Sequence, residues 1–122
     1  MKIEYYNPKD EKKSCIYRAI SKALDRDYME IKKELDLLKE KLNTEDSQLV
    51  FETYLFKNNY KANDKYKDYN LFDVDYSGVN VVFCNDNDWY HLVCIIDNVL
   101  YDKKTYDDLK DMNIIRIYTI DN

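Results

Sequence analysis

A predicted β-hairpin over residues 89–102 is the feature that most constrains the fold of this chain. It also holds the only histidine, His91. Residues 90–96 are apolar, β-branched and aromatic, which is typical of a buried strand. Asp97 and Asn98 both tolerate a positive φ, so they can form a two-residue turn. The chain is then expected to return as a second strand over residues 99–102.

A two-residue turn also fixes which side chains share a face of the hairpin. It pairs Ile96 with Val99, Val93 with Asp102, and His91 with Lys104. Because side chains alternate between faces, His91 and Asp102 become diagonal neighbours on one face, roughly 7–8 Å apart between backbone positions. We therefore expect a hydrogen bond between them. A longer turn would slip the register and send Asp102 to the other face.

The length and composition predict one globular domain over residues 1–122. Hydrophobic residues make up 45% of the chain, which excludes a disordered tail. The formal net charge is −5, which argues against sequence-independent binding of nucleic acid or of an acidic membrane surface. The expected partner is therefore a protein or a peptide.

The sequence also predicts a cytoplasmic protein, acting in the host cytoplasm if a phage encodes it. The N-terminus has no apolar signal core, and no apolar run approaches the length of a membrane span. Three cysteines are an odd number for a disulfide framework, so reduced thiols are expected.

Hydrophobic periodicity predicts helices first and strands second. Apolar residues at helical spacing predict helices over residues 14–24, 28–42 and 45–59. Alternation predicts strands over residues 79–84 and 114–120 beside the hairpin. Residues 2–6 are a short strand or an extended arm, and residues 106–111 are a short helix or turn. Residues 60–70 are a loop or a ragged strand, and residues 71–76 are left open between a helical turn and an edge strand. The expected fold is a single α+β domain, with N-terminal helices packed on a C-terminal antiparallel β-sheet.

Two details of the helices follow from residue type and spacing. Ser14 and Asp27 are the expected N-caps of the first two helices, because their side-chain oxygens can accept from free backbone N–H groups. The third helix is expected to bury its apolar side, which consists of Leu49, Val50, Thr53, Tyr54 and Phe56.

Cys15 is the candidate nucleophile. It falls in the first turn of the first predicted helix, where the helix presents partial positive charge, and Lys12 and Lys13 precede it. Positive charge lowers the pKa of a thiol, and the thiolate is the reactive form. His91 can take the thiol proton and return it to a leaving group, while Asp102 holds the imidazole in the required tautomer.

Two motifs carry a family likeness. A Cys-x-x-Arg-Ala sequence opens the first predicted helix at residues 15–19, and the histidine strand runs through a turn into Tyr101-Asp102. With the order of helices followed by a sheet, these motifs resemble small papain-like cysteine peptidases, in the compact forms found in phage and bacterial genomes. The likeness covers most of the chain. It implies a papain-like fold, with Cys15 as nucleophile, His91 as general base and Asp102 as orienting acid.

Supporting roles are assigned to three further residues. The glutamine that usually lies upstream of the cysteine is absent, so Asn7, the only amide side chain there, is assigned as oxyanion donor beside the backbone N–H of Cys15. Arg18 lies one helical turn after Cys15 and is expected to pair with an acid near the lobe interface, or alternatively to bind substrate. Trp89 and Tyr90 directly precede His91, and the two are expected to narrow or close the cleft.

No metal or cofactor is expected. A zinc site needs closely spaced Cys and His pairs, and Gly78, the only glycine, cannot build a glycine-rich phosphate loop. Cys84 and Cys94 lie in apolar strands and are assigned to packing. Residues 85–88 are read as a turn rather than a calcium loop, because the glycine and the closing glutamate of such a loop are missing.

The expected function is a cysteine peptidase-like hydrolase, which cleaves an amide or isopeptide bond through an acyl-enzyme on Cys15. The same groups can run acyl transfer. The rival hypothesis is a papain-like scaffold without catalysis, whose acidic surface mimics nucleic acid or occupies a basic partner as a binding or inhibitory protein. Residues 60–70 are the segment expected to line the cleft.

Overall fold

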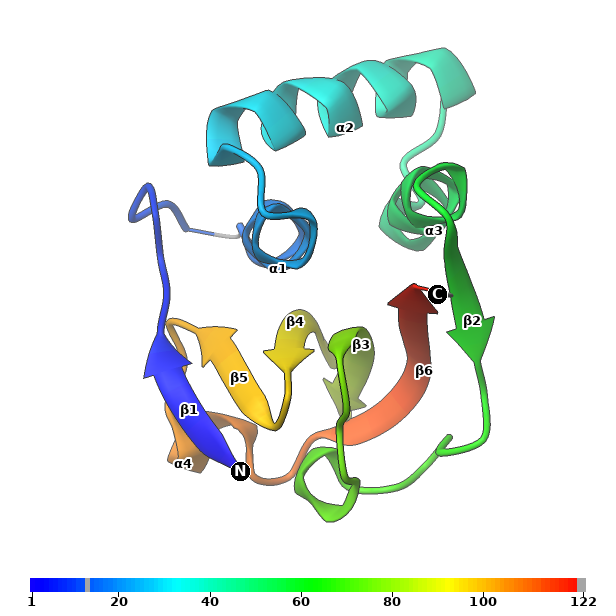
Figure 1. Cartoon of the computed structure of the whole chain (residues 1–122). Helices are drawn as coiled ribbons and strands as arrows, with labels where there is room; N and C mark the ends of the chain where they lie inside the picture. Colours follow the sequence, from blue (N-terminus) through cyan, green and yellow to red (C-terminus); the bar gives the residue numbers. More distant parts are fainter. Residues whose placement is uncertain (13, 121–122) are drawn as a thin grey trace.

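A computed structural model of the chain describes residues 1–12 and 14–120. Its helices are α1 (Cys15–Leu24), α2 (Tyr28–Leu42), α3 (Ser47–Lys57) and α4 (Tyr106–Leu109), with a short 3-10 helix, η1, at Leu71–Asp73. Its strands are β1 (Lys2–Tyr5), β2 (Tyr60–Asn63), β3 (Val79–Asp86), β4 (Trp89–Ile96), β5 (Val99–Asp102) and β6 (Asn113–Ile120). Helices α1, α2 and α3 lie on one side of the sheet and α4 on the other (Figure 1).

The strands form one sheet in the order β1-β5-β4-β3-β6-β2. Every pair in it is antiparallel except β1 with β5, which run parallel. The expectation of an antiparallel sheet built from the C-terminal half alone is therefore corrected at both edges. β1 joins β5 from the N-terminus, as a parallel strand can when a long connection separates the two, and β2 adds the opposite edge.

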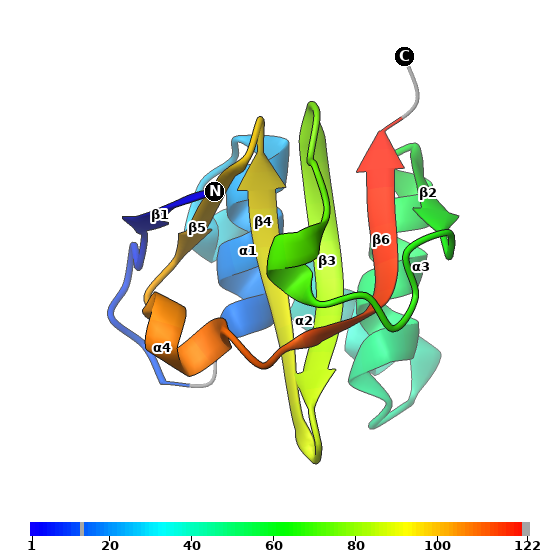
Figure 2. The same cartoon turned by 90° about the horizontal axis from the view of Figure 1, so that it is seen from below.

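The hairpin of β4 and β5 forms around the predicted turn. Asp97 and Asn98 have φ values of 47° and 64°, the left-handed conformation that a tight hairpin turn needs. The ladder contains Ile96 with Val99, Ile95 with Leu100 and Cys94 with Tyr101, which is the predicted register. It ends there, so the expected pairs of Val93 with Asp102 and His91 with Lys104 are not part of it. Figure 2 shows β4 and β5 spreading apart toward α4 beyond this point.

The sheet carries a separate hydrophobic core on each face. The core beneath the helices includes Ile20, Ile31, Leu35, Phe51, Leu55 and Leu92. The core on the other face is covered by η1 and α4 and includes Leu71, Val93, Ile95, Leu100, Leu109 and Met112. Successive residues of β4 alternate between the two cores, which explains why this strand is apolar throughout.

Helix α3 buries only part of the side expected: Val50 and Tyr54 are buried as predicted, but Leu49 and Phe56 are not. Leu49 and Phe56 are 44% and 46% exposed, whereas Phe51 and Leu55 are buried with Val50 and Tyr54. Apolar side chains surround much of this helix, so the sequence alone does not decide which side faces the core. The ring of Phe51 packs edge-on against Phe83 and Tyr118 of the sheet, and this contact selects the buried side.

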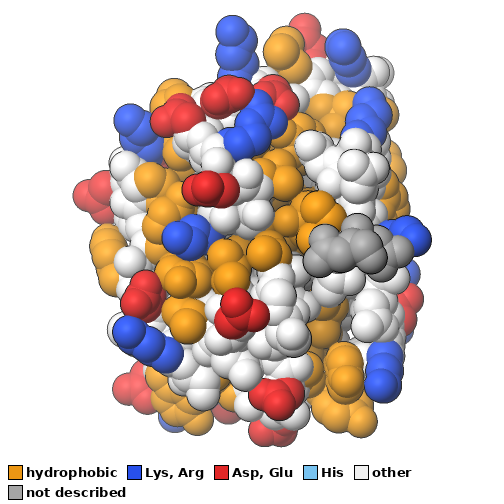
Figure 3. Space-filling view, in the orientation of Figure 1, with side chains coloured by type: hydrophobic (Ala, Val, Ile, Leu, Met, Phe, Trp, Pro, Cys, Tyr) orange, Lys and Arg blue, Asp and Glu red, His pale blue; other side chains and the backbone are white. Residues whose placement is uncertain are grey.

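The structure assigns elements to the two segments whose secondary structure the sequence left open, residues 60–70 and 71–76. Residues 60–63 form the edge strand β2, and residues 71–73 form η1. On the face seen in Figure 3, acidic and basic side chains are interspersed among exposed hydrophobic ones. Within residues 1–12 and 14–120, no helix is long and apolar enough to cross a membrane.

The turn at Asn98 gives a direct test of the hairpin. The side chain of Asn98 accepts from the Tyr76 N–H at 2.7 Å and donates to Asp75 at 2.9 Å, while its backbone is left-handed. Both Asn98→Gly and Asn98→Ala lose these hydrogen bonds. Glycine adopts the left-handed backbone without strain, whereas alanine keeps a β-carbon that is strained there. We expect Asn98→Ala to lower the free energy of unfolding by about 1 kcal/mol more than Asn98→Gly, measured by urea denaturation. Equal stabilities of the two variants would contradict the left-handed turn.

Candidate active site

Cys15 is the first residue of α1, as predicted, but Ser14 does not cap the helix through its side chain. Ser14 Oγ donates to the backbone carbonyl of Glu11 at 3.0 Å and accepts from Arg18 Nη1 at 2.8 Å. Ser14 therefore occupies the predicted N-cap position without the predicted capping bond, because a buried guanidinium holds the hydroxyl. The Ser14 side chain therefore accepts no hydrogen bond from the backbone N–H groups at the start of α1. The partial positive charge of these groups lies beside the thiol.

His91 and Asp102 form the hydrogen bond that the hairpin predicted. His91 Nε2 lies 2.6 Å from Asp102 Oδ2, and both side chains are almost completely buried. The carboxylate therefore fixes the orientation of the imidazole. Since Nε2 is engaged with Asp102, Nδ1 is the ring nitrogen left for the interaction with Cys15.

Arg18 binds the other oxygen of the same carboxylate. Its Nε lies 2.7 Å from Asp102 Oδ1, and the arginine is only 1% exposed. An acidic partner for Arg18 was expected, but the partner is the orienting acid itself. The sequence predicted separate roles for Arg18 and Asp102. The feature that could have predicted their pairing is the position of Arg18 within the apolar stripe of α1, because a buried charge needs a buried partner of opposite charge.

The environment of Cys15 and His91 favours a thiolate next to an imidazolium. Burial alone would raise the pKa of Cys15, but the hydrogen bond and charge of His91, the backbone N–H of Leu92 and the charge of Arg18 outweigh it and lower that pKa. Burial likewise opposes protonation of His91, but the bonds and charges of Asp102 and Cys15 outweigh it and raise its pKa to about 9. The lowered pKa of the thiol and the raised pKa of the imidazole both favour the proton on nitrogen.

The other two thiols are in the opposite situation. Cys84 and Cys94 are free and buried in the cores, as their assignment to packing implies. Burial raises the pKa of Cys94 to about 12 and raises that of Cys84 still further. They therefore serve as internal controls for Cys15 in any measurement of thiol reactivity.

The remaining predicted site residues fall in different places. The ring of Trp89 lies 5.4 Å from that of His91, with the two planes tilted by 36°. Asn7 donates to Asp10 at 3.2 Å and lines neither of the pockets that reach Cys15, so it stays a prediction without a supporting contact. Lys12 is exposed, and Lys13 lies outside the described residues.

Two pockets meet at Cys15, Tyr90 and His91. The aromatic pocket, of about 450 Å³, extends toward α3 and is further lined by Phe51, Phe83, Leu92 and residues 45–48. The basic pocket, of about 390 Å³, extends toward the end of β5 and is further lined by Ser14, Arg18, Trp89, Lys103 and Lys104.

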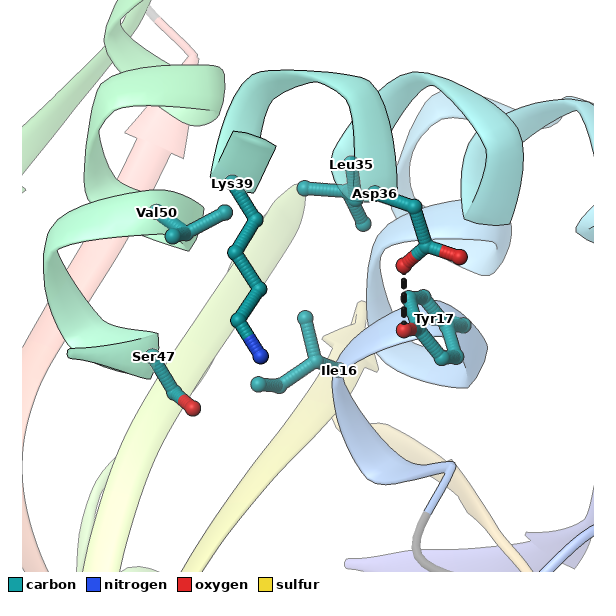
Figure 4. A pocket seen from close by; sticks show the side chains of 7 residues that line it. All are labelled: Ile16, Tyr17, Leu35, Asp36, Lys39, Ser47 and Val50. Atoms are coloured by element: carbon teal, nitrogen blue, oxygen red, sulfur yellow. Dashed lines mark hydrogen bonds between the residues drawn. The ribbon is translucent and has the colours of Figure 1, made fainter. Parts of the chain in front are cut away.

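Residues 60–70 line neither pocket, so the expectation that they form the cleft is wrong. Strand β2 lies at the far edge of the sheet, with β3 and β6 between it and β4. The start of α3 takes that place instead. A third pocket, of about 160 Å³ between α1, α2 and α3, shares Ile16 and Ser47 with the aromatic pocket and continues it toward Lys39 and Asp36 (Figure 4).

Comparison with models of known protein families, with curated proteins and with solved structures gives no match. No group of three or more metal-ligating side chains occurs among residues 1–12 and 14–120.

The single histidine makes its titration easy to follow by NMR. Because the pKa of His91 is raised to about 9, its ring carbon protons should still show the imidazolium at pH 7 and shift only as the pH approaches 9. Cys15→Ser removes the thiolate that stabilises the charged ring, so the pKa should fall. A midpoint near 6.5 in the wild type, unchanged in Cys15→Ser, would contradict the ion pair.

The pair of Arg18 with Asp102 should contribute strongly to stability because it is buried. Arg18→Met leaves the carboxylate without its guanidinium and should lower the free energy of unfolding by about 3–5 kcal/mol. Arg116, which pairs with Asp64 and with Glu52 at 2.8 Å each and is 32% exposed, provides a partly exposed control. Arg116→Met should cost about 1 kcal/mol or less. Urea denaturation of both variants tests this, and equal losses would show that the buried pair has no special role.

Proposed function

We propose that the protein is a papain-like cysteine hydrolase that cleaves an amide or isopeptide bond through an acyl-enzyme on Cys15. One observation carries the proposal: Arg18, Asp102, His91 and Cys15 form a continuous series of contacts that ends at a thiol with a lowered pKa. A packing cysteine needs no such support. Cys84 and Cys94, buried among apolar side chains, have raised pKa values.

The series of contacts accounts for both halves of the reaction. The Cys15 thiolate attacks the carbonyl carbon, and backbone N–H groups at the start of α1 stabilise the oxyanion. The C–N bond then breaks, and the imidazolium of His91 transfers its Nδ1 proton to the departing amine. Neutral His91 next takes a proton from water, which attacks the thioester and releases a carboxylic acid and the free thiol. An amine in place of water gives acyl transfer.

The other residues keep His91 effective through this cycle. Asp102 stays ionised: burial opposes this, but the hydrogen bond and charge of His91 and the charge of Arg18 outweigh it and lower its pKa. The carboxylate can therefore stabilise the imidazolium whenever it forms. Three free thiols fit a reducing compartment, so we place the proposed activity in the cytoplasm.

Selective alkylation tests the proposed nucleophile. Iodoacetamide labelling across a range of pH, read by peptide mass spectrometry, should modify Cys15 below about pH 7, far ahead of Cys84 and Cys94. His91→Ala should move the labelling profile of Cys15 to higher pH. A labelling midpoint of Cys15 near pH ~8.5 that is the same in His91→Ala would support the rival hypothesis of a scaffold without catalysis.

Turnover is tested with a mixed peptide library of defined sequences. Wild-type protein should generate new peptide termini that mass spectrometry detects, and Cys15→Ala should generate none. His91→Ala should slow cleavage by a factor of at least 10²–10⁴, the usual contribution of a general acid and base. Cleavage that persists in Cys15→Ala would remove Cys15 as the nucleophile.

A further inference from the structure

The basic pocket is unusual for this chain. The protein has a formal net charge of −5, yet the pocket beside Cys15 is lined by Arg18, Lys103 and Lys104 and by no acidic side chain. Arg18 is neutralised by its pair with Asp102. The two lysines therefore give the pocket its charge, and the positive end of α1 adds to it.

Neither lysine has an acidic partner. Lys103 Nζ donates to the backbone carbonyl of Glu11 at 3.2 Å, and Lys104 Nζ lies 5.7 Å from the centre of the Trp89 ring. Among the residues that the structure describes, no carboxylate lies within ion-pair distance of either ammonium group. Asp108 interacts with Lys104 only through charge beyond ion-pair distance, so an anion can bind there without displacing a directly paired carboxylate.

Trp89 links this charge to the catalytic group. Its ring lies 5.4 Å from that of His91, and Lys104 Nζ lies 5.7 Å from the centre of the same ring. Trp89 therefore contacts both the imidazole and the ammonium group of Lys104. Lys103 follows Asp102 directly in sequence, so both lysines are fixed by the strand that also supplies the orienting acid.

The aromatic pocket on the other side of Cys15 has the opposite character. The rings of Phe51 and Phe83 lie 5.2 Å apart, and Phe83 stacks on Tyr90 at 5.9 Å. Glu45 and Asp46 also line this pocket. Since β5 and β3 flank β4 on opposite sides, the two pockets extend from the thiol in opposite directions. A substrate with one anionic end therefore has one favoured orientation.

We propose that the basic pocket binds a carboxylate of the substrate, so that the protein prefers peptides with an acidic side chain or a free C-terminal carboxylate beside the cleaved bond. The apolar part of the peptide then occupies the aromatic pocket. The preference for such peptides rests on the proposed function, because it requires that the protein cleaves peptides. The charge effect itself can be measured on the thiol whether or not turnover occurs.

The test compares alkylation of Cys15 by anionic iodoacetate and by neutral iodoacetamide. The ratio of the two rates reports the local attraction for a carboxylate, because the iodoacetamide rate corrects each variant for ionisation of the thiol. Lys103→Gln/Lys104→Gln should lower this ratio by a factor of about 3–10, as expected for the loss of two partly screened charges. Lys33→Gln/Lys41→Gln on α2 changes the net charge equally and should leave the ratio unaltered.

The outcomes separate the two proposals. An unchanged ratio in Lys103→Gln/Lys104→Gln, or an equal fall in the α2 control, overturns the carboxylate pocket. An ordinary iodoacetamide profile of Cys15 overturns the proposed function alone, because the ratio can still be measured above about pH 9, where an ordinary thiol is ionised.

The peptide library distinguishes the two sources of the carboxylate. Enrichment of Asp or Glu beside internal cleavage sites indicates an acidic side chain, whereas cleavage confined to the ends of peptides with free C-termini, and lost on amidation, indicates the terminal carboxylate. Each preference should weaken in Lys103→Gln/Lys104→Gln. Cleavage with no preference for either group contradicts the proposal.

Discussion

The carboxylate of Asp102 is the point on which the site depends, because Arg18 and His91 bind its two oxygens at 2.7 Å and 2.6 Å. Burying one carboxylate costs free energy unless opposite charge and hydrogen bonds compensate it. Here the compensation comes from α1 and from β4, so the same three groups tie the helix to the sheet and orient the imidazole. Stability and the proposed catalysis therefore rest on one interaction.

The shape of the sheet makes that interaction possible. The ladder between β4 and β5 ends after the pair of Cys94 with Tyr101, and the strands then separate. Arg18 from α1 binds Asp102 at the end of β5, beyond the paired part of the hairpin. A fully paired hairpin would occupy this space with backbone hydrogen bonds. The same separation opens the basic pocket between Trp89 and the residues that follow Asp102.

The sequence predicted the parts of the fold that local chemistry decides. Asp97 and Asn98 specified the turn, and its register followed from their number. The predicted bond of His91 with Asp102 forms, although the ladder ends before the pairs from which it was predicted. Contacts between distant segments were missed. Arg18 and Asp102 are 84 residues apart, and nothing local marks them as partners. The parallel addition of β1, the buried side of α3 and the cleft residues 45–48 also depend on how separate elements pack.

The central claim is that Cys15 exists as a thiolate beside a protonated His91, and ultraviolet absorbance of the thiolate measures this directly. The difference in absorbance between the wild type and Cys15→Ser, followed against pH, isolates this thiol from Cys84 and Cys94. The account predicts a thiolate already present at about pH 7, because the pKa of Cys15 is lowered, and its loss at that pH in His91→Ala. A thiolate that appears only near ~8.5 in both proteins would contradict it.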